Sequence, residues 1–197
     1  MTPVILASTS TARIALLRGA GVTFDAVASG VDEDAAKAAL LGEQATPRGI
    51  ADALAELKAL KVSRKTDGLV IGADTTLDLD GELVDKATDL EGARRRLTVL
   101  RGRSHKLHSG VVVARGGEAI WREVQSATLT MRDFSDAFLE GYLRRQGEAI
   151  LSSIGCYHLE GEGVQLFDRI DGDYFTILGL PLLGLLDLLR RHGAMAT

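Results

Sequence analysis

The chain has 197 residues, of which 46% are hydrophobic and 25% are charged, so it can bury a sizeable core as an ordinary globular protein. Its net charge of −4 gives no global positive field for DNA or RNA, and any polyanion that it binds must be small and locally held. Cys156 is the only cysteine, which excludes an intramolecular disulfide bond and a zinc site made of cysteines.

The apolar segments do not fit a signal peptide or a membrane span. Residues 1–7 have no basic region before their apolar run and predict a strand. The most apolar stretch, 178–189, is shorter than a bilayer requires and ends in two arginines. We therefore expect a cytoplasmic protein that binds neither nucleic acid nor membrane.

Strands and helices alternate in the amino-terminal half. Pro47 suits the first position of a helix, whose inner face is expected to carry Ile50, Leu54 and Leu57. The predicted elements are a strand at 4–7, a helix that ends at Gly19 to Gly21, a strand at 22–28, the helix opened by Thr46-Pro47, a strand at 69–73, and a hairpin turn at Asp80-Gly81 between 76–79 and 82–84.

The carboxyl-terminal half pairs its strands as hairpins. Thr88 and Glu91 fit a capping box that starts a helix with Leu90 on its inner side. The later predicted elements are strands at 105–114 and 119–131 joined at Gly116-Gly117, a helix capped by Ser135, a strand at 164–170, and a last helix from Pro181 to Arg191. Since no repeat or linker divides residues 1–197, the pattern predicts an α/β fold with a mixed sheet in a single domain.

A hydroxyl-rich loop, Ser8-Thr9-Ser10-Thr11-Ala12-Arg13, lies between the first strand and the first helix. A helix start offers unpaired N–H groups and a partial positive charge, which favour a phosphate, and the hydroxyls and the arginine would add donors. Taken alone, the loop fits better with a simpler role, in which Ser10 caps the helix and Arg13 is solvated.

An aspartate follows the buried strand in Ile71-Gly72-Ala73-Asp74-Thr75. Ligands of α/β folds sit at the carboxyl end of strands, where a carboxylate can hold a divalent metal or orient water. In isolation, a capped strand end in a turn explains Asp74 equally well. Four other residues, each a surface charge when taken alone, would join it and the loop in supplying the cations and carboxylates that phosphoryl transfer needs: Asp32, Glu33, Lys58 and Lys86.

Two further patterns carry less information. The segment 155–163 contains a GxG without the third glycine or the following helix of a dinucleotide site, and its glycines would instead let the backbone approach a ligand that Glu160 faces. His105 and His108 lie on a predicted strand with no obvious third ligand. A packed or hydrogen-bonded role is therefore favoured for both over metal binding or catalysis.

Several separated motifs occur in order over nearly the whole chain. They are Leu-Ala-Ser-Thr-Ser-x-x-Arg-x-x-Leu-Leu at 6–17, Val-Asp-Glu at 31–33, Gly-Ala-Asp-Thr at 72–75, Leu-x-Gly-x-x-His-x-x-x-Ser-Gly-Val at 100–111, and Glu-Gly-x-Gly at 160–163 through Gly-Asp-Tyr-Phe-Thr-Ile-Leu-Gly-Leu-Pro-Leu at 172–182. Together they resemble the Maf family of nucleotide pyrophosphatases, some of which were first linked to septum formation.

The resemblance implies an inosine-triphosphatase-like α/β fold, with an elongated mixed sheet, flanking helices and two lobes around a cleft. It also implies hydrolysis of the α–β phosphoanhydride of nucleoside triphosphates to monophosphate and pyrophosphate, with a divalent cation, Mg²⁺ or Mn²⁺. It is compatible with a homodimer. One alternative, within enzymes, is a pyrophosphatase that acts broadly on modified nucleotides in a cleanup role. Another is a nucleotide-binding regulator of cell division with little turnover, against which the intact Asp74, Lys58 and Lys86 argue.

By motif position, the resemblance assigns roles to individual residues. Asp74 matches the family's proton acceptor, and Glu33 and Asp74 match its metal-handling carboxylates. The phosphate-handling set corresponds to Ser8, Ser10, Arg13, Lys58 and Lys86, and the positions that select the base correspond to Ala12, Thr75 and Glu160.

The base-selecting positions depart from both types known in the family. The dTTP/UTP type carries arginine, threonine and glutamine there, and the 7-methyl-GTP type carries tryptophan, glutamine and glutamate. The Glu160 carboxylate can accept the two donors of guanine's edge, which favours a guanine-like base, whereas Ala12 cannot stack on a methylated guanine as tryptophan could. Thr11 and Ala87 stand where proline is common, and neither change removes a functional group.

Overall fold

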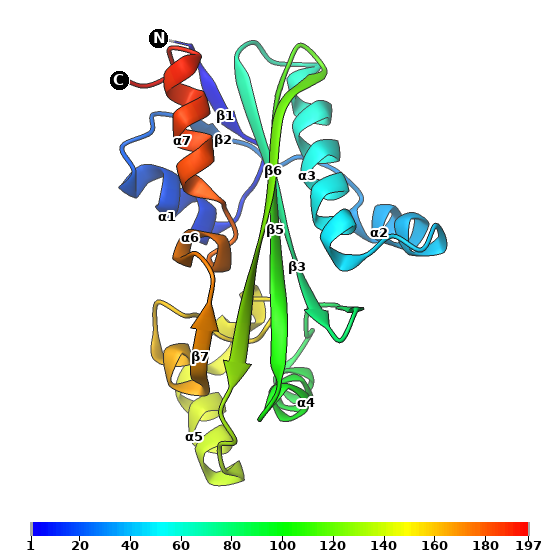
Figure 1. Cartoon of the computed structure of the whole chain (residues 1–197), viewed down its shortest axis with the longest axis vertical. Helices are drawn as coiled ribbons and strands as arrows, with labels where there is room; N and C mark the ends of the chain where they lie inside the picture. The colour runs from blue at the N-terminus through cyan, green and yellow to red at the C-terminus, as the bar shows by residue number, and fades with distance from the viewer. Residues whose placement is uncertain (1, 197) are drawn as a thin grey trace.

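The computed structural model describes residues 2–196 and arranges them around one long sheet (Figure 1). Seven strands form the sheet, in the order β2-β1-β3-β5-β6-β7, with β4 paired to β3. β1 is parallel to β2 and β3, and all the other pairs are antiparallel. The predicted α/β class with a mixed sheet is therefore confirmed.

The elements have the following bounds. The strands are β1 Val4–Leu6, β2 Asp25–Ala26, β3 Leu69–Leu79, β4 Glu82–Val84, β5 Ser104–Arg115, β6 Glu118–Met131 and β7 Phe167–Asp171. The α-helices are α1 Thr11–Gly19, α2 Glu33–Gly42, α3 Pro47–Ser63, α4 Leu90–Leu100, α5 Asp136–Gln146, α6 Tyr174–Ile177 and α7 Leu182–Arg191, and two 3₁₀ helices span Gly147–Ser152 and Glu162–Leu166. None of the helices within residues 2–196 is long and apolar enough to cross a membrane.

Two large hydrophobic clusters occupy opposite ends of the sheet. The upper cluster joins the sheet to α1 and α7 and includes Leu6, Leu17, Ile71, Val113 and Leu185. The lower cluster joins it to α4 and α5 and includes Leu77, Leu97, Leu129, Phe134 and Tyr142. β3, β5 and β6 run the length of the molecule and contribute to both ends (Figure 1), so the two cores share one set of strands.

Two glycines bring α3 very close to the sheet. A Cβ atom on Gly72 of β3 would lie 2.1 Å from the Ala55 carbonyl oxygen, and one on Gly110 of β5 would lie 2.7 Å from that of Ala51. No side chain other than hydrogen fits at either position. The close approach of α3 to the sheet determines how near the side chains on the next turn of α3 lie to β3.

Side-chain caps begin most of the helices where the sequence predicts them. Ser10, Thr46 and Ser135 each accept a hydrogen bond from the backbone N–H three residues later. The prediction of a capping box at Thr88 is wrong by one residue. The cap of α4 is Asp89, whose side chain accepts a hydrogen bond from the Gly92 N–H at 2.6 Å. An aspartate is as good an N-cap as a threonine, so composition alone does not separate the two positions.

Other boundaries and faces also differ from expectation. The strand predicted at 22–28 is confined to β2, and the one at 164–170 is divided between a 3₁₀ helix and β7. Leu57 and Leu90 are exposed, at 41% and 37% of their surface, not buried. In α3 the buried positions recur at 50, 54, 58 and 62, so Lys58, and not its neighbour Leu57, occupies the inner face.

Candidate active site

The site begins where β1 stops and β3 continues. β1 ends at Leu6, opposite Ile71, whereas β3 extends to Leu79. Asp74 therefore lies in the middle of its strand, and the expectation that it ends the strand is wrong. The parallel part of the sheet ends three residues before it, and residues 74–76 of β3 line one cleft.

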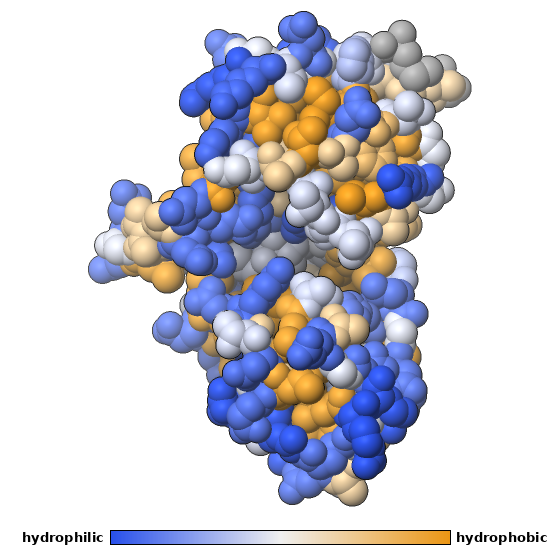
Figure 2. Space-filling view, turned by 180° about the vertical axis from the view of Figure 1, so that it is seen from behind, coloured by the Kyte–Doolittle hydropathy of each residue, from blue (hydrophilic) through white to orange (hydrophobic). Residues whose placement is uncertain are grey.

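The cleft lies between the upper and lower halves of the molecule and has a volume of about 880 Å³. Figure 2 shows the molecule hollowed at its waist. All ten residues assigned roles from the family resemblance line this one cleft: Ser8, Ser10, Ala12, Arg13, Glu33, Lys58, Asp74, Thr75, Lys86 and Glu160. Asp32 instead caps α2, where it accepts from the Ala35 N–H at 3.0 Å.

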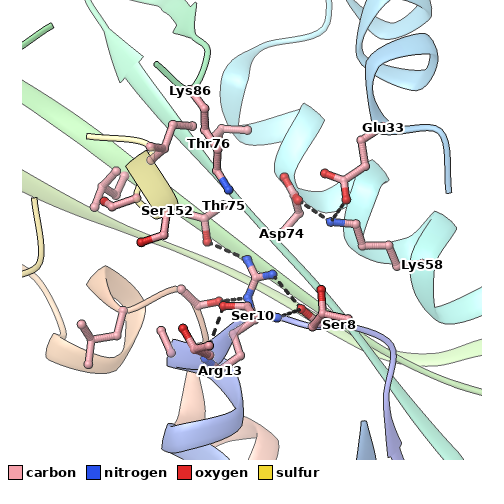
Figure 3. Close-up of a pocket in the computed structure, with 18 of the residues that line it drawn as sticks. Ser8, Ser10, Arg13, Glu33, Lys58, Asp74, Thr75, Thr76, Lys86 and Ser152 are labelled. Carbon is pink, nitrogen blue, oxygen red and sulfur yellow. Dashed lines mark hydrogen bonds and ion pairs between the residues drawn. The ribbon is translucent and has the colours of Figure 1, made fainter. Parts of the chain in front are cut away.

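Two carboxylates converge on one ammonium group (Figure 3). The Lys58 Nζ lies 2.7 Å from an Asp74 oxygen and 2.9 Å from a Glu33 oxygen. The Lys58 and Asp74 side chains are buried, whereas Glu33 is partly exposed. Desolvation tends to raise the pKa of Glu33, but its hydrogen bond to Lys58 and the charges of Lys58, Lys37 and Arg13 outweigh this effect and lower it. Glu33 is therefore anionic at neutral pH.

Arg13 approaches the same cleft from the opposite face of β3. Adjacent strand residues point to opposite sides, so Asp74 faces α3 while Thr75 faces α1. The Arg13 guanidinium donates to the Gly179 carbonyl at 2.8 Å, the Thr75 hydroxyl at 3.1 Å and the Ser8 hydroxyl at 3.4 Å. Burial lowers the Arg13 pKa, with Asp74 and Glu33 acting the other way, and an arginine nevertheless stays protonated.

The hydroxyl-rich loop holds the start of α1 open to the cleft. The Ser10 hydroxyl accepts from the Arg13 N–H, and the Ser8 hydroxyl accepts from the Ser10 N–H at 3.2 Å. Ser10 thus caps the helix as the simpler role required, but Arg13 is buried and not solvated. The loop supplies a helix start and a cation together, which is the arrangement that suits a phosphate.

The remaining predicted residues come from other walls of the cleft. Lys86 is exposed in the segment after β4, and in Figure 3 Lys86 and Arg13 approach the centre from opposite sides. Glu160 is exposed in the segment that follows the first 3₁₀ helix, beside His158 and Leu159. Charges from both halves of the chain therefore face one space.

The donor set fits a divalent cation only together with a substrate. Among residues 2–196, no group of three or more His, Cys, Asp or Glu side chains surrounds a single point. Oxygens of Glu33 and Asp74 nevertheless converge on one position, which Lys58 Nζ occupies. Mg²⁺ is commonly held by one or two carboxylates plus substrate phosphates, so two carboxylates are sufficient.

The two histidines make hydrogen bonds outside the chemistry of the cleft. His105 Nε2 lies 2.7 Å from the Tyr157 hydroxyl, and His108 bridges Ser126 at 2.6 Å and Asp78 at 3.1 Å. These contacts agree with the favoured packed or hydrogen-bonded role.

Two residues that contribute to the cleft were not predicted from the sequence. The Gly179 carbonyl is the nearest acceptor of Arg13, and Lys37 of α2 lines the cleft one turn after Glu33. A backbone carbonyl can accept a hydrogen bond whatever the residue type, so the sequence does not indicate which carbonyl will do so. Gly179 nevertheless belongs to the motif at 172–182. The i, i+4 spacing of Glu33 and Lys37 was the available signal for the lysine.

The chain is similar to known proteins over nearly its whole length. A family model described as Maf-like protein matches residues 3–192. A nucleoside triphosphate pyrophosphatase of Caulobacter vibrioides is 68% identical to this chain, covering all of it and 99% of the relative. Another, of Granulibacter bethesdensis, is 51% identical over 98% of both chains, and a 7-methyl-GTP pyrophosphatase of Brucella abortus is 50% identical over 95% of both. Because the match runs from one end of the chain to the other and includes every residue of the cleft described above, this chain belongs to the Maf family.

Proposed function

We propose that this chain hydrolyses nucleoside triphosphates between the α- and β-phosphates, releasing a monophosphate and pyrophosphate. The observation that carries the proposal is the meeting of two carboxylates, Asp74 and Glu33, with the buried cations Lys58 and Arg13 in one cleft. Phosphoryl chemistry needs this combination, because cations offset phosphate charge and a carboxylate can take a proton from water. The names of the relatives support the same activity.

In the proposed complex, the phosphates lie against the start of α1. The Ser8 and Ser10 hydroxyls and the helix N–H groups bind phosphate oxygens, and the fixed guanidinium of Arg13 adds a positive charge. Lys58 and Lys86 offset the charge that grows on the leaving pyrophosphate.

Asp74 is the proposed proton acceptor. Its carboxylate faces the cleft from β3 and is held by Lys58, so it is positioned beside bound phosphates. Glu33 and Asp74 would also hold Mg²⁺ or Mn²⁺ together with phosphate oxygens. Such a cation, when bound, lowers the pKa of its water, so that a base as weak as aspartate suffices.

The proposal is tested by identifying the products from a panel of ordinary and modified triphosphates, with Mg²⁺ or Mn²⁺, in ¹⁸O-labelled water. We expect monophosphate and pyrophosphate, with the label in the monophosphate because pyrophosphate is the leaving group. Diphosphate and phosphate as products would mean a different hydrolase. Tight nucleotide binding with no products would instead support a regulator with little turnover.

A further inference from the structure

The motif at 172–182 has one role described so far, the Gly179 carbonyl that accepts a hydrogen bond from Arg13. In the structure its central part, α6 and the turn to Gly179, also contributes Ile177, Leu178 and Gly179 to the wall of the cleft. Gly179 has a φ of +96°, and a Cβ there would lie 3.0 Å from the Thr75 hydroxyl and 3.5 Å from Arg13 Nε. The segment therefore fits closely against the two residues that meet above it.

A chain of hydrogen bonds links this segment to Arg13. Arg13 Nη2 donates to Thr75 Oγ1 at 3.1 Å, Thr75 Oγ1 lies 3.0 Å from Ser109 Oγ, and Ser109 Oγ donates to the Thr176 carbonyl at 2.7 Å. Ser109 comes from β5, is fully buried, and is absent from the lining of the cleft. A bound nucleotide therefore has no direct contact with it.

The number of protons fixes the direction of this chain. A carbonyl oxygen can only accept, so the single Ser109 hydroxyl proton goes to Thr176. The Thr75 hydroxyl must then donate its own proton to Ser109, and its lone pairs are left facing Arg13. Each hydroxyl thus has one orientation, and the acceptor presented to the guanidinium cannot rotate away.

We infer that Ser109 is a positioning residue that acts through Thr75 to fix the guanidinium of Arg13. It follows that Thr75, which stands at a base-selecting position of the family, is committed in this chain to the phosphate-binding arginine, with no proton left to donate to a base. The binding of phosphate by Arg13 rests on the proposed function, whereas the positioning of its guanidinium by Ser109 and Thr75 does not.

The test compares two buried serines that each donate to a backbone carbonyl. Ser109→Ala removes one hydroxyl from the chain of hydrogen bonds that leads to Arg13. Ser63→Ala, in α3 behind the β5–β6 turn, removes a hydroxyl that donates to the Leu60 carbonyl. We expect similar losses of thermal stability in both variants. Only Ser109→Ala should lower kcat/KM, by about 10-fold, since small misplacements of a binding group are costly to rate. Equal kcat/KM in the two variants would overturn the inference.

A double-mutant cycle asks whether Ser109 acts through Thr75. Thr75→Val keeps the shape of the side chain and removes the hydroxyl. If Ser109 works only through that hydroxyl, the double variant should be no slower than Thr75→Val alone. Losses that multiply would mean that Ser109 acts by another route, and the inference would fall.

A spectroscopic measurement separates this inference from the proposed activity. The two Nη groups of Arg13 have different partners, Ser8 and Thr75, so restricted rotation should give them separate proton and nitrogen resonances in the wild type. These resonances, assigned by their loss in Arg13→Lys, should merge in Ser109→Ala and stay separate in Ser63→Ala. Should the wild type lack hydrolytic activity, this result would still decide how Arg13 is held.

Discussion

Among the single residues of the cleft, Asp74 has the most specific proposed role, that of the proton acceptor. Asp74→Asn keeps the shape and the hydrogen-bonding oxygen toward Lys58 but removes the base. We expect kcat to fall by about 10²-fold or more, the range for loss of a general base, and thermal stability to fall as well, because the buried Lys58 ammonium loses one of its two carboxylates. Asp67→Asn, an exposed aspartate before β3, is the matched control and should retain full turnover. A folded Asp74→Asn enzyme with near wild-type turnover would remove Asp74 from this role.

Glu160 tests the choice of base. A carboxylate accepts two hydrogen bonds, whereas an amide offers one acceptor and one donor and so matches uracil and thymine better. We expect Glu160→Gln to shift the ratio of kcat/KM values from GTP toward UTP and dTTP, measured over one nucleotide panel. An unchanged ranking would show that the exposed Glu160 does not face the base.

His105 makes stability depend on pH, independently of the cleft. Burial lowers its pKa from 6.5 to about 4. Below pH 6.5 the unfolded chain binds a proton that the folded protein does not, so the folded state loses stability as the pH falls toward 4. His105→Phe removes this term. The unfolding free energy of the wild type, relative to the variant, should therefore drop by about 2 kcal/mol between pH 7.5 and 5.0 in urea titrations. Parallel pH profiles would contradict the shift.

At the level of elements, the sequence was most informative where one residue determines a local structure. The caps at Ser10, Thr46 and Ser135 and the hairpin turn at Asp80-Gly81 follow from local backbone chemistry, and the structure has them all. Local patterns predicted strand at 69–73 and at 76–79 but could not show that the two form one strand through Asp74, because that continuity depends on pairing with β5 far along the chain. Nor could they place Lys58 inside, since its burial depends on Asp74 and Glu33.

The contacts that hold Arg13 could not be predicted from the sequence for the same reason. Ser109, Thr176 and Gly179 meet Arg13 and Thr75 only after the sheet has formed, and their hydrogen bonds span 34 to 166 residues of sequence. A small or hydroxyl residue in a strand has many explanations. The family resemblance located the motif but said nothing of what it supports.

Gly179 offers a test of that support. Gly179→Ala should lower both stability, through strain at a φ of +96°, and kcat/KM, because the added Cβ pushes on Thr75 and Arg13. Gly21→Ala, with a φ of +73° and open space around it, carries the strain without the contact. Both variants should lose about 1–2 kcal/mol in thermal unfolding. Only Gly179→Ala should lose activity, and equal activity in the two would argue against a close fit of Gly179 to Thr75 and Arg13.

For the whole molecule, the cleft lies between two cores that the same strands connect. β6 carries Trp121, the only tryptophan, against the upper cluster and Leu129 in the lower cluster. If these strands couple the halves, damage to the lower cluster must reach the upper one, and the chain unfolds as a single domain.

Leu129→Ala tests this coupling. Removing a fully buried leucine should cost about 3 kcal/mol and lower Tm by about 10 °C for a domain of this size. We expect the tryptophan fluorescence of Trp121, at the far end of β6, to report the same lowered Tm as far-UV circular dichroism. Leu185→Ala in the upper cluster should give coincident transitions too. A tryptophan transition that stays at the wild-type Tm while circular dichroism falls in two steps would instead mean two independent lobes, and the walls of the cleft would then be free to move against each other.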